Sequence, residues 1–213
     1  MNRDWNRINK YYSELLFDIY PQEMDEKHYA EMVEAIEVIP KKTSSVSSIL
    51  DVGCGRGDAQ HLFESLGYKY MGMSLGEDSG IGYSRGNAVL NDDFHFIDFE
   101  DDTFDLIFAR HVLEHSPMPL LALMEWHRVS KKYLYLIFPN PEYWSWFGRN
   151  HYYVLNRQQL RWILRRAGWE IIYRKYTEKE FRLLCIKRPR VGYEGYLQSP
   201  LPATIYERER DDK

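Results

Sequence analysis

The 213-residue sequence predicts an α/β fold with a doubly wound, mostly parallel sheet of seven strands and helices on both faces. Apolar strand segments alternate with amphipathic helical segments between residues 46 and 170, which is the pattern of a parallel sheet covered on both sides. The last two strand segments, 169–176 and 181–187, are separated by too few residues for a parallel crossover. One strand near the C-terminal end should therefore run antiparallel.

The individual elements follow from apolar runs and from helical spacing of apolar residues. The expected strands are 46–52, 68–74, 88–90, 104–109, 133–138, 169–176 and 181–187. Helices are expected over 58–66, from the pair Ser116-Pro117 onward, and after Asn156, which suits a helix N-cap. The stretch 75–86 contains four glycines and is expected to form a loop rather than a full helix.

Three parts of the chain are expected. Residues 1–45 carry two apolar stripes at helical spacing, the second ended by Pro40, and should form an N-terminal helical cover. Residues 46–188 should form the α/β domain, and residues 189–213, which are rich in Pro and Gly and then charged, should form a tail. A homodimer through this tail or through the aromatic loop 143–153 is the expected assembly.

Composition excludes several classes of partner. The net charge of −4, without a basic patch, makes nucleic acid an unexpected partner. Cys54 and Cys185 lie far apart and give no disulfide framework, which fits a reducing cytosol. The N-terminus lacks a signal-peptide pattern, and no apolar run approaches the roughly 20 residues of a membrane span. A cytoplasmic location is therefore expected.

The loop after the first strand reads Asp-Val-Gly-Cys-Gly-Arg-Gly-Asp over residues 51–58. Glycines there permit a tight turn and let a ligand touch the backbone. Dinucleotide sites use Gly-x-Gly-x-x-Gly to place a pyrophosphate at a helix N-terminus. Here the spacing is Gly-x-Gly-x-Gly, and Asp51 and Asp58 would repel a pyrophosphate. The loop suits a ligand with a cationic amino-acid end and disfavours a nucleotide-dependent oxidoreductase.

This segment resembles the first motif of the class I methyltransferases, which bind S-adenosylmethionine. The similarity to the type 11-like members continues in order through 93–107, 110–117, 138–141 and 155–169, and it covers most of residues 46–187. The resemblance implies a Rossmann-like fold and S-adenosylmethionine as cofactor. It further implies methyl transfer to an oxygen or nitrogen of a small or medium-sized acceptor, a small molecule or a glycan.

The resemblance also assigns cofactor contacts to single positions. The residues concerned are Asp51, Gly53, Cys54, Gly55, Ser74, Asp93, Phe94, Arg110 and His111. The glycine loop would contact the methionine and ribose parts, with Asp51 orienting the amino group. Asp93 would face the adenine amino group, with Phe94 beside the ring. Arg110 and His111 would line the floor near the sulfonium.

One position departs from the family pattern. The family usually has an acidic residue at the end of the second strand, where the carboxylate binds the ribose hydroxyls, and Ser74 stands there instead. A hydroxyl makes one such bond, so the exchange costs about 1–3 kcal/mol of cofactor affinity. Glu77 or Asp78 could reach back and replace the carboxylate. Otherwise the cofactor site is degenerate, and the chain is a non-catalytic binding or scaffold protein.

Two histidines are candidate catalytic bases. His111 lies near the expected sulfonium position and His151 lies in the aromatic loop on the same rim, and a histidine of ordinary pKa accepts a proton at neutral pH. The alternative for the aromatic loop is a hydrophobic lid or an interface. His111, Glu114 and His115 also match a zinc peptidase pattern, but that pattern needs both histidines on one helical face and a third ligand. The segment lies at a strand-to-helix junction, so no metal is expected.

Overall fold

The computed structural model describes residues 5–16, 24–143 and 150–190. Its seven strands form one sheet in the order β3-β2-β1-β4-β5-β7-β6. The strands are β1 (Ser48–Val52), β2 (Lys69–Ser74), β3 (Val89–Asn91), β4 (Phe104–Arg110), β5 (Ser130–Pro139), β6 (Trp169–Tyr176) and β7 (Glu180–Lys187). Strand β7 pairs antiparallel with both of its neighbours, and the other strand pairs are parallel. The predicted fold class is confirmed.

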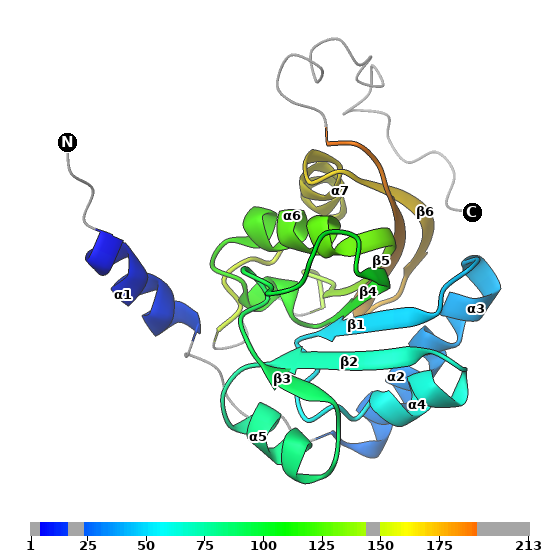
Figure 1. The fold of residues 1–213 in the computed structure, drawn as a ribbon. Coiled ribbons are helices and arrows are strands. Elements are labelled where there is room, and N and C mark those ends of the chain that lie inside the picture. The colour runs from blue at the N-terminus through cyan, green and yellow to red at the C-terminus, as the bar shows by residue number, and fades with distance from the viewer. Residues whose placement is uncertain (1–4, 17–23, 144–149, 191–213) are drawn as a thin grey trace.

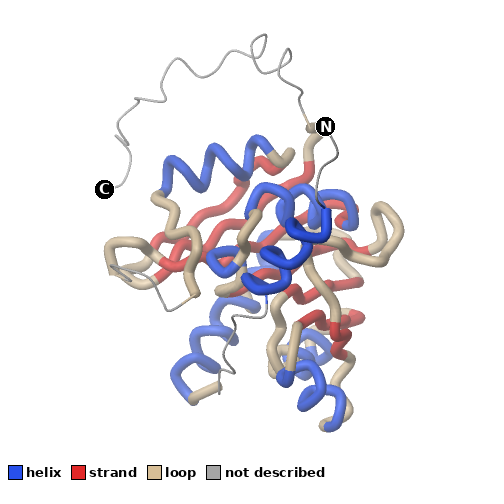
Figure 2. Tube along the Cα trace, turned by 90° about the vertical axis from the view of Figure 1, so that its left-hand side faces the viewer, coloured by secondary structure: helices blue, strands red, loops and turns tan. Residues whose placement is uncertain are grey.

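Helices cover both faces of this sheet (Figures 1 and 2). The described helices are α1 (Trp5–Leu16), α2 (Glu26–Ile36), α3 (Val38–Lys42), α4 (Gln60–Ser65), α5 (Glu77–Ser84), η1 (Leu113–His115), α6 (Pro119–Val129) and α7 (Arg157–Arg166). Figure 1 shows α6 and α7 on one side of the sheet and α2, α3 and α4 on the other. Among the described helices, none is long and apolar enough to cross a membrane.

Side-chain alternation along the strands divides the apolar core into two layers. Leu50 and Ile107 belong to the layer under α6 and α7, whereas their neighbours Ile49 and Leu106 belong to the layer under α2, α3 and α4. Successive strand residues point to opposite faces, so a strand buried on both sides reads as a continuous apolar run. The buried indole of Trp126 donates a hydrogen bond to the Phe94 carbonyl at 3.1 Å, which satisfies its only polar group.

The structure corrects the prediction of a loop over 75–86, because α5 forms within it. Gly76 has φ +72° and is the N-cap of this helix. A Cβ on Gly82 would lie 2.7 Å from the Arg56 carbonyl oxygen. The glycines therefore allow α5 to approach the backbone of the first loop closely, rather than preventing a helix.

Two helix ends also differ from expectation. The helix expected from Ser116-Pro117 begins at Pro119, because the chain first forms the short turn η1, and the Ser116 hydroxyl accepts a bond from the Met118 amide at 3.1 Å. Pro40 does not end a helix but lies in the first turn of α3, where its missing N–H costs little. Asn156 caps α7 as predicted, with Gln159 completing a capping box.

Some predictions lie outside the described residues. They concern the aromatic loop over residues 144–149 and the tail beyond residue 190. The division of the chain at residues 45 and 188 stays a prediction. Within the described part, Met32, Ile36 and Ile39 of the N-terminal helices are buried in the same apolar layer as β1 and β4.

Candidate cofactor and acceptor site

The glycine loop leaves β1 at the carboxyl edge of the parallel strands. The Cys54 amide donates to the Met73 carbonyl at 3.0 Å, which fixes the loop to β2. Gly53 and Gly55 have φ of +68° and +57°. A Cβ on Gly53 would lie 2.2 Å from Val112 Cγ2, whereas one on Gly55 would meet no described atom within 4 Å. The first glycine is therefore required by packing, and the second leaves the backbone open to a ligand.

Asp51 lies beneath this loop and is almost fully buried, with 3% exposure. Burial raises its pKa to about 7, although a hydrogen bond from Tyr70 at 3.0 Å and the nearby charge of Arg110 oppose this rise. A carboxylate whose desolvation is not compensated binds a cationic group favourably. The site thus fits the amino group of an amino-acid ligand.

The end of β2 shows what stands in for the usual acidic residue. Ser74 is half-buried, and its carbonyl accepts a bond from the Asp92 amide at 3.2 Å. Asp78 forms a 2.8 Å ion pair with Arg56, and both side chains are 15% exposed. This ion pair links the glycine loop to α5. Because the carboxylate of Asp78 is paired with Arg56, it does not take the place of the usual acidic residue at the end of β2. Glu77 is exposed at the start of α5.

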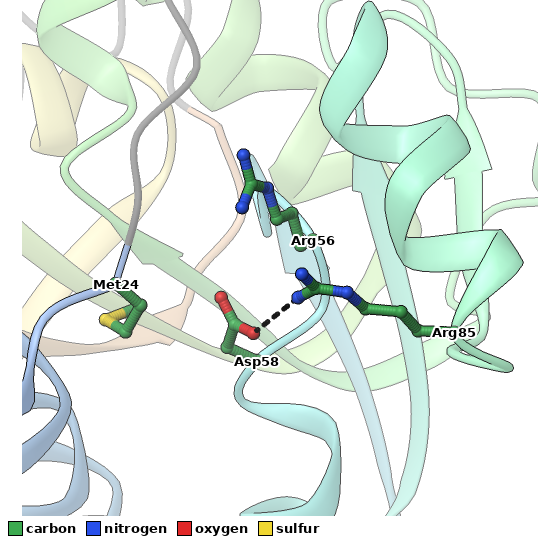
Figure 3. A pocket seen from close by; sticks show the side chains of 4 residues that line it. All are labelled: Met24, Arg56, Asp58 and Arg85. Atoms are coloured by element: carbon green, nitrogen blue, oxygen red, sulfur yellow. Dashed lines mark ion pairs between the residues drawn. The ribbon is translucent and has the colours of Figure 1, made fainter.

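A cavity of about 290 Å³ lies beside the glycine loop and is lined by Met24, Arg56, Asp58 and Arg85. Figure 3 shows the Arg85 guanidinium directed at the Asp58 carboxylate, with Nη1 and Oδ1 4.0 Å apart. None of these residues belongs to the predicted cofactor contacts. The candidate site is therefore defined by the loop geometry and by Asp51, not by this cavity.

Asp93 follows β3 and forms a compact hydrogen-bonded group. Its Oδ1 accepts from the His95 amide at 2.9 Å, and its Oδ2 accepts from the Tyr12 hydroxyl of α1 at 2.5 Å. Burial would raise the pKa of Asp93, but the hydrogen bonds from His95 and Tyr12 outweigh it and lower the pKa. The carboxylate predicted to face the adenine amino group is thus ionised, and α1 contacts it.

The two phenylalanines beside Asp93 have different surroundings. Phe94 is 9% exposed and packs in the core, with its ring centroid 5.9 Å from that of Trp126. Phe96 is 57% exposed and contacts the Tyr12 ring at 5.9 Å. The structure therefore places Phe96 and Tyr12, which sequence reasoning missed, on the open side of this loop. No local pattern singles out Phe96, because residues 94–96 lie in a turn and Phe94, two positions earlier, is buried.

His111 follows β4 and has φ +52°, which is uncommon for a residue other than glycine. Its Nε2 lies 2.9 Å from Glu180 Oε2 and its Nδ1 lies 3.4 Å from Glu114 Oε1. Burial alone would lower the pKa of His111, but the two carboxylates outweigh burial and raise the pKa to about 9. The imidazole is therefore protonated at neutral pH, which makes it a poor proton acceptor.

Arg110 ends β4, and its side chain is only 11% exposed. Its Nη2 lies 4.0 Å from Glu31 Oε2, and within the described residues Nε and Nη2 donate no hydrogen bond. Burial lowers the pKa of Arg110, while the charges of Glu180 and Glu31 oppose this. A buried guanidinium with free donors suits an anionic group of a ligand.

Sequence reasoning also missed Glu180 and Arg182 of β7. The Arg182 Nε donates to Glu180 Oε1 at 2.6 Å, and the two side chains are 3% and 4% exposed. Because β7 pairs with β5, this ion pair lies beside His111 although Glu180 is 69 residues away in sequence. The arginine inside an otherwise apolar strand run was the available signal, because a charged residue there needs a partner.

His151 lies against η1. The Tyr152 and Tyr153 amides both donate to the Glu114 carbonyl, at 2.7 and 3.2 Å, and the rings of His115 and His151 lie 4.7 Å apart in an edge arrangement. Burial lowers the pKa of His151, so its imidazole is neutral at neutral pH. The structure thus brings both predicted catalytic histidines to Glu114.

These features define a class of protein. The sheet has the order 3-2-1-4-5-7-6 with β7 antiparallel, a glycine loop follows β1, and an acidic residue follows β3. Together these features are those of the class I, Rossmann-like, S-adenosylmethionine-dependent methyltransferase fold. A family model described as a methyltransferase domain matches residues 24–174. The chain belongs to this family.

Solved structures give the same fold. The complex between the Haloferax volcanii Trm112 methyltransferase activator and a methyltransferase matches with a TM-score of 0.67 and 14% identity, covering 78% of this chain and 92% of that one. A SAM-dependent methyltransferase from Aquifex aeolicus matches with a TM-score of 0.61 and 20% identity, covering 87% and 100%.

A third similar structure is the magnesium protoporphyrin IX methyltransferase of Synechocystis with bound SAM. It matches with a TM-score of 0.60 and 14% identity, covering 88% of this chain and 98% of that one. No curated protein matches the sequence. At these identities the structures establish the fold alone, so acceptor and residue roles must be argued from the site.

Proposed function

We propose that the chain transfers a methyl group from S-adenosylmethionine to an oxygen or nitrogen atom of a small or medium-sized acceptor, a small molecule or a glycan. The observation that carries this proposal is the buried carboxylate of Asp51 beneath the open backbone of Gly55. Asp51 would bind the amino group of the cofactor, and the free donors of Arg110 would bind its carboxylate. Together they match both charges of an amino-acid end.

The other end of the cofactor would be held by weaker contacts. Asp93 would accept a hydrogen bond from the adenine amino group, and Ser74 would make one bond to the ribose. Because Ser74 lacks the charge of a carboxylate, we expect cofactor binding to be weaker than with an acidic residue, by about 1–3 kcal/mol.

Positioning would supply much of the rate, because methyl transfer is an in-line displacement. When bound, the cofactor supplies the electrophilic methyl group. His151, which is neutral, is the better candidate to accept a proton from the acceptor. His111, held as a cation between Glu114 and Glu180, would position the floor of the site.

Location and partners remain part of the proposal. The net charge of −4 disfavours nucleic acid as the acceptor. We further propose a cytoplasmic protein that forms a homodimer through the aromatic loop or the tail. Size-exclusion chromatography with light scattering tests the homodimer directly.

Calorimetric titration with S-adenosylhomocysteine tests the cofactor site. We expect a micromolar dissociation constant for the parent protein, at least about tenfold weaker binding by Asp51→Asn, and no binding of a nicotinamide dinucleotide. Asp98→Asn is the matched control, because Asp98 is exposed outside the site. No binding by the folded parent protein at millimolar ligand would instead support a non-catalytic scaffold that has kept the fold.

A further inference from the structure

Three potential metal ligands converge beside the predicted acceptor position. One ligand atom from each of Glu114, His115 and His151 lies within 4.8 Å of the other two. Two imidazoles and one carboxylate form a ligand set that binds Zn²⁺ and related divalent ions. His111, which the sequence pattern paired with His115, is turned to Glu180 instead. The third ligand comes from a segment 36 positions further along the chain.

The backbone holds this cluster in place. The Glu114 carbonyl accepts bonds from the amides of Tyr152 and Tyr153, at 2.7 and 3.2 Å, so the segment carrying His151 is fixed on η1. His115 Nδ1 lies 3.2 Å from the Asn150 carbonyl oxygen, which leaves Nε2 of this ring available. A hydrogen bond from one ring nitrogen to a carbonyl is the usual way in which a metal-binding histidine is oriented.

The carboxylate supplies an independent observation. Glu114 is fully buried, at 0% exposure, and within the described residues neither of its carboxylate oxygens accepts a hydrogen bond. The nearby charged group is His111, whose Nδ1 lies 3.4 Å from Glu114 Oε1. His151 Nδ1 also lacks a hydrogen-bond partner among these residues. Buried polar atoms are rarely left without partners, and a coordinated cation would satisfy these atoms together.

We propose that Glu114, His115 and His151 form a binding site for a divalent transition-metal ion, with an open coordination position that faces the methyl acceptor. An acceptor hydroxyl would bind the ion through its oxygen, and its O–H bond would break with the proton passing to water. The O–CH3 bond would then form as the S–CH3 bond breaks. The ion would take the place of His151 in activating the acceptor. This catalytic role rests on the proposed methyl transfer, whereas the metal site itself does not.

Titration of the chelator-treated full-length protein with Zn²⁺, followed by calorimetry, tests the site. We expect one ion per chain and a loss of affinity of about 100-fold or more in both His115→Ala and His151→Ala. Titration with Co²⁺ should give the visible ligand-field spectrum of a low-coordinate site. His61→Ala is the matched control, because His61 is exposed on α4.

Far-ultraviolet circular dichroism of each variant shows whether the fold is retained, and S-adenosylhomocysteine binding by the same samples separates the two proposals. Stoichiometric Zn²⁺ binding that depends on His115 and His151 but not on His61 supports the metal site, whether or not S-adenosylhomocysteine binds. If the folded parent binds no Zn²⁺ at about 100 μM, the metal proposal is overturned. It is equally overturned if both site variants bind as tightly as His61→Ala.

Discussion

Asp51 and Glu180 are buried carboxylates in two regions of the site, and they are in opposite electrostatic states. The first, the glycine-loop region, comprises residues 51–58 with the ends of β2 and β3. The second, the histidine region, comprises residues 110–115 with His151 and Glu180. Burial raises the pKa of Asp51 to about 7 in the first region. In the second, burial would raise the pKa of Glu180, but His111 and Arg182 lower it to about 2.

The difference in pKa indicates that Asp51 is suited to bind a ligand, whereas Glu180 stabilises the fold. Glu180 already has two cationic partners in the protein, so its charge contributes to stability. Asp51 accepts a hydrogen bond from the uncharged Tyr70 hydroxyl, and no cationic side chain of the described residues forms an ion pair with it. Its charge therefore costs stability until a cationic ligand binds. Substituting the two carboxylates by amides should therefore change stability in opposite directions.

The largest effect is expected for Glu180→Gln. The variant should lose about 3 kcal/mol of unfolding free energy at pH 7, because His111 and Arg182 lose their buried counter-charge. Since the pKa of Glu180 in the fold lies below its usual value, this contribution is complete above about pH 5 and is lost as the pH falls toward 2. Urea unfolding at several pH values measures it.

Glu170→Gln is the matched control, because Glu170 forms an ion pair with Arg188 in which both side chains are 55% exposed. This substitution should change stability by no more than about 0.5 kcal/mol. An equal loss of unfolding free energy in the two variants would mean that the buried ion pairs of Glu180 stabilise the fold no more than an exposed ion pair does.

A second effect distinguishes two glycines of the same loop. Gly53→Ala should cost about 2 kcal/mol, because a Cβ would overlap Val112 and the residue has φ +68°. Gly55→Ala should cost only about 1 kcal/mol but weaken S-adenosylhomocysteine binding, because its Cβ points into open space. Chemical unfolding and calorimetry on the same samples measure both quantities. Equal stability of the two variants would refute the packing role of Gly53.

The same contrast explains what could be predicted from the sequence. The seven strands and the glycine loop are local patterns, and Asp51 could be singled out because it stands two positions before the first glycine. Glu180 and Tyr12 were not found, because their contacts with His111 and Asp93 span 69 and 81 residues. Helix α5 was missed because Gly82 allows close packing against the Arg56 backbone. The conformational preference of glycine alone does not distinguish a glycine that permits close packing from one that forms a loop.

Asp51→Asn should raise stability while weakening cofactor binding. The pKa of Asp51 in the fold lies above its usual value, so the cost of ionising it is absent at low pH and becomes complete above about pH 7. The gain in unfolding free energy should be about 2 kcal/mol larger at pH 8 than at pH 5. Asp98→Asn should show no such difference, since Asp98 is exposed. A variant less stable than the parent at pH 8 would show that Asp51 is structural, like Glu180.

The smallest effect is expected at the contact between α1 and the glycine-loop region. Tyr12→Phe removes the hydrogen bond to Asp93 Oδ2 and should increase amide hydrogen exchange in α1 about fivefold, which corresponds to about 1 kcal/mol. Tyr11→Phe is the control, because Tyr11 is 56% exposed on the same helix. A carboxylate oxygen accepts more than one bond, so S-adenosylhomocysteine affinity should change less than about threefold. A tenfold gain would instead show that Tyr12 competes with the adenine amino group for Asp93.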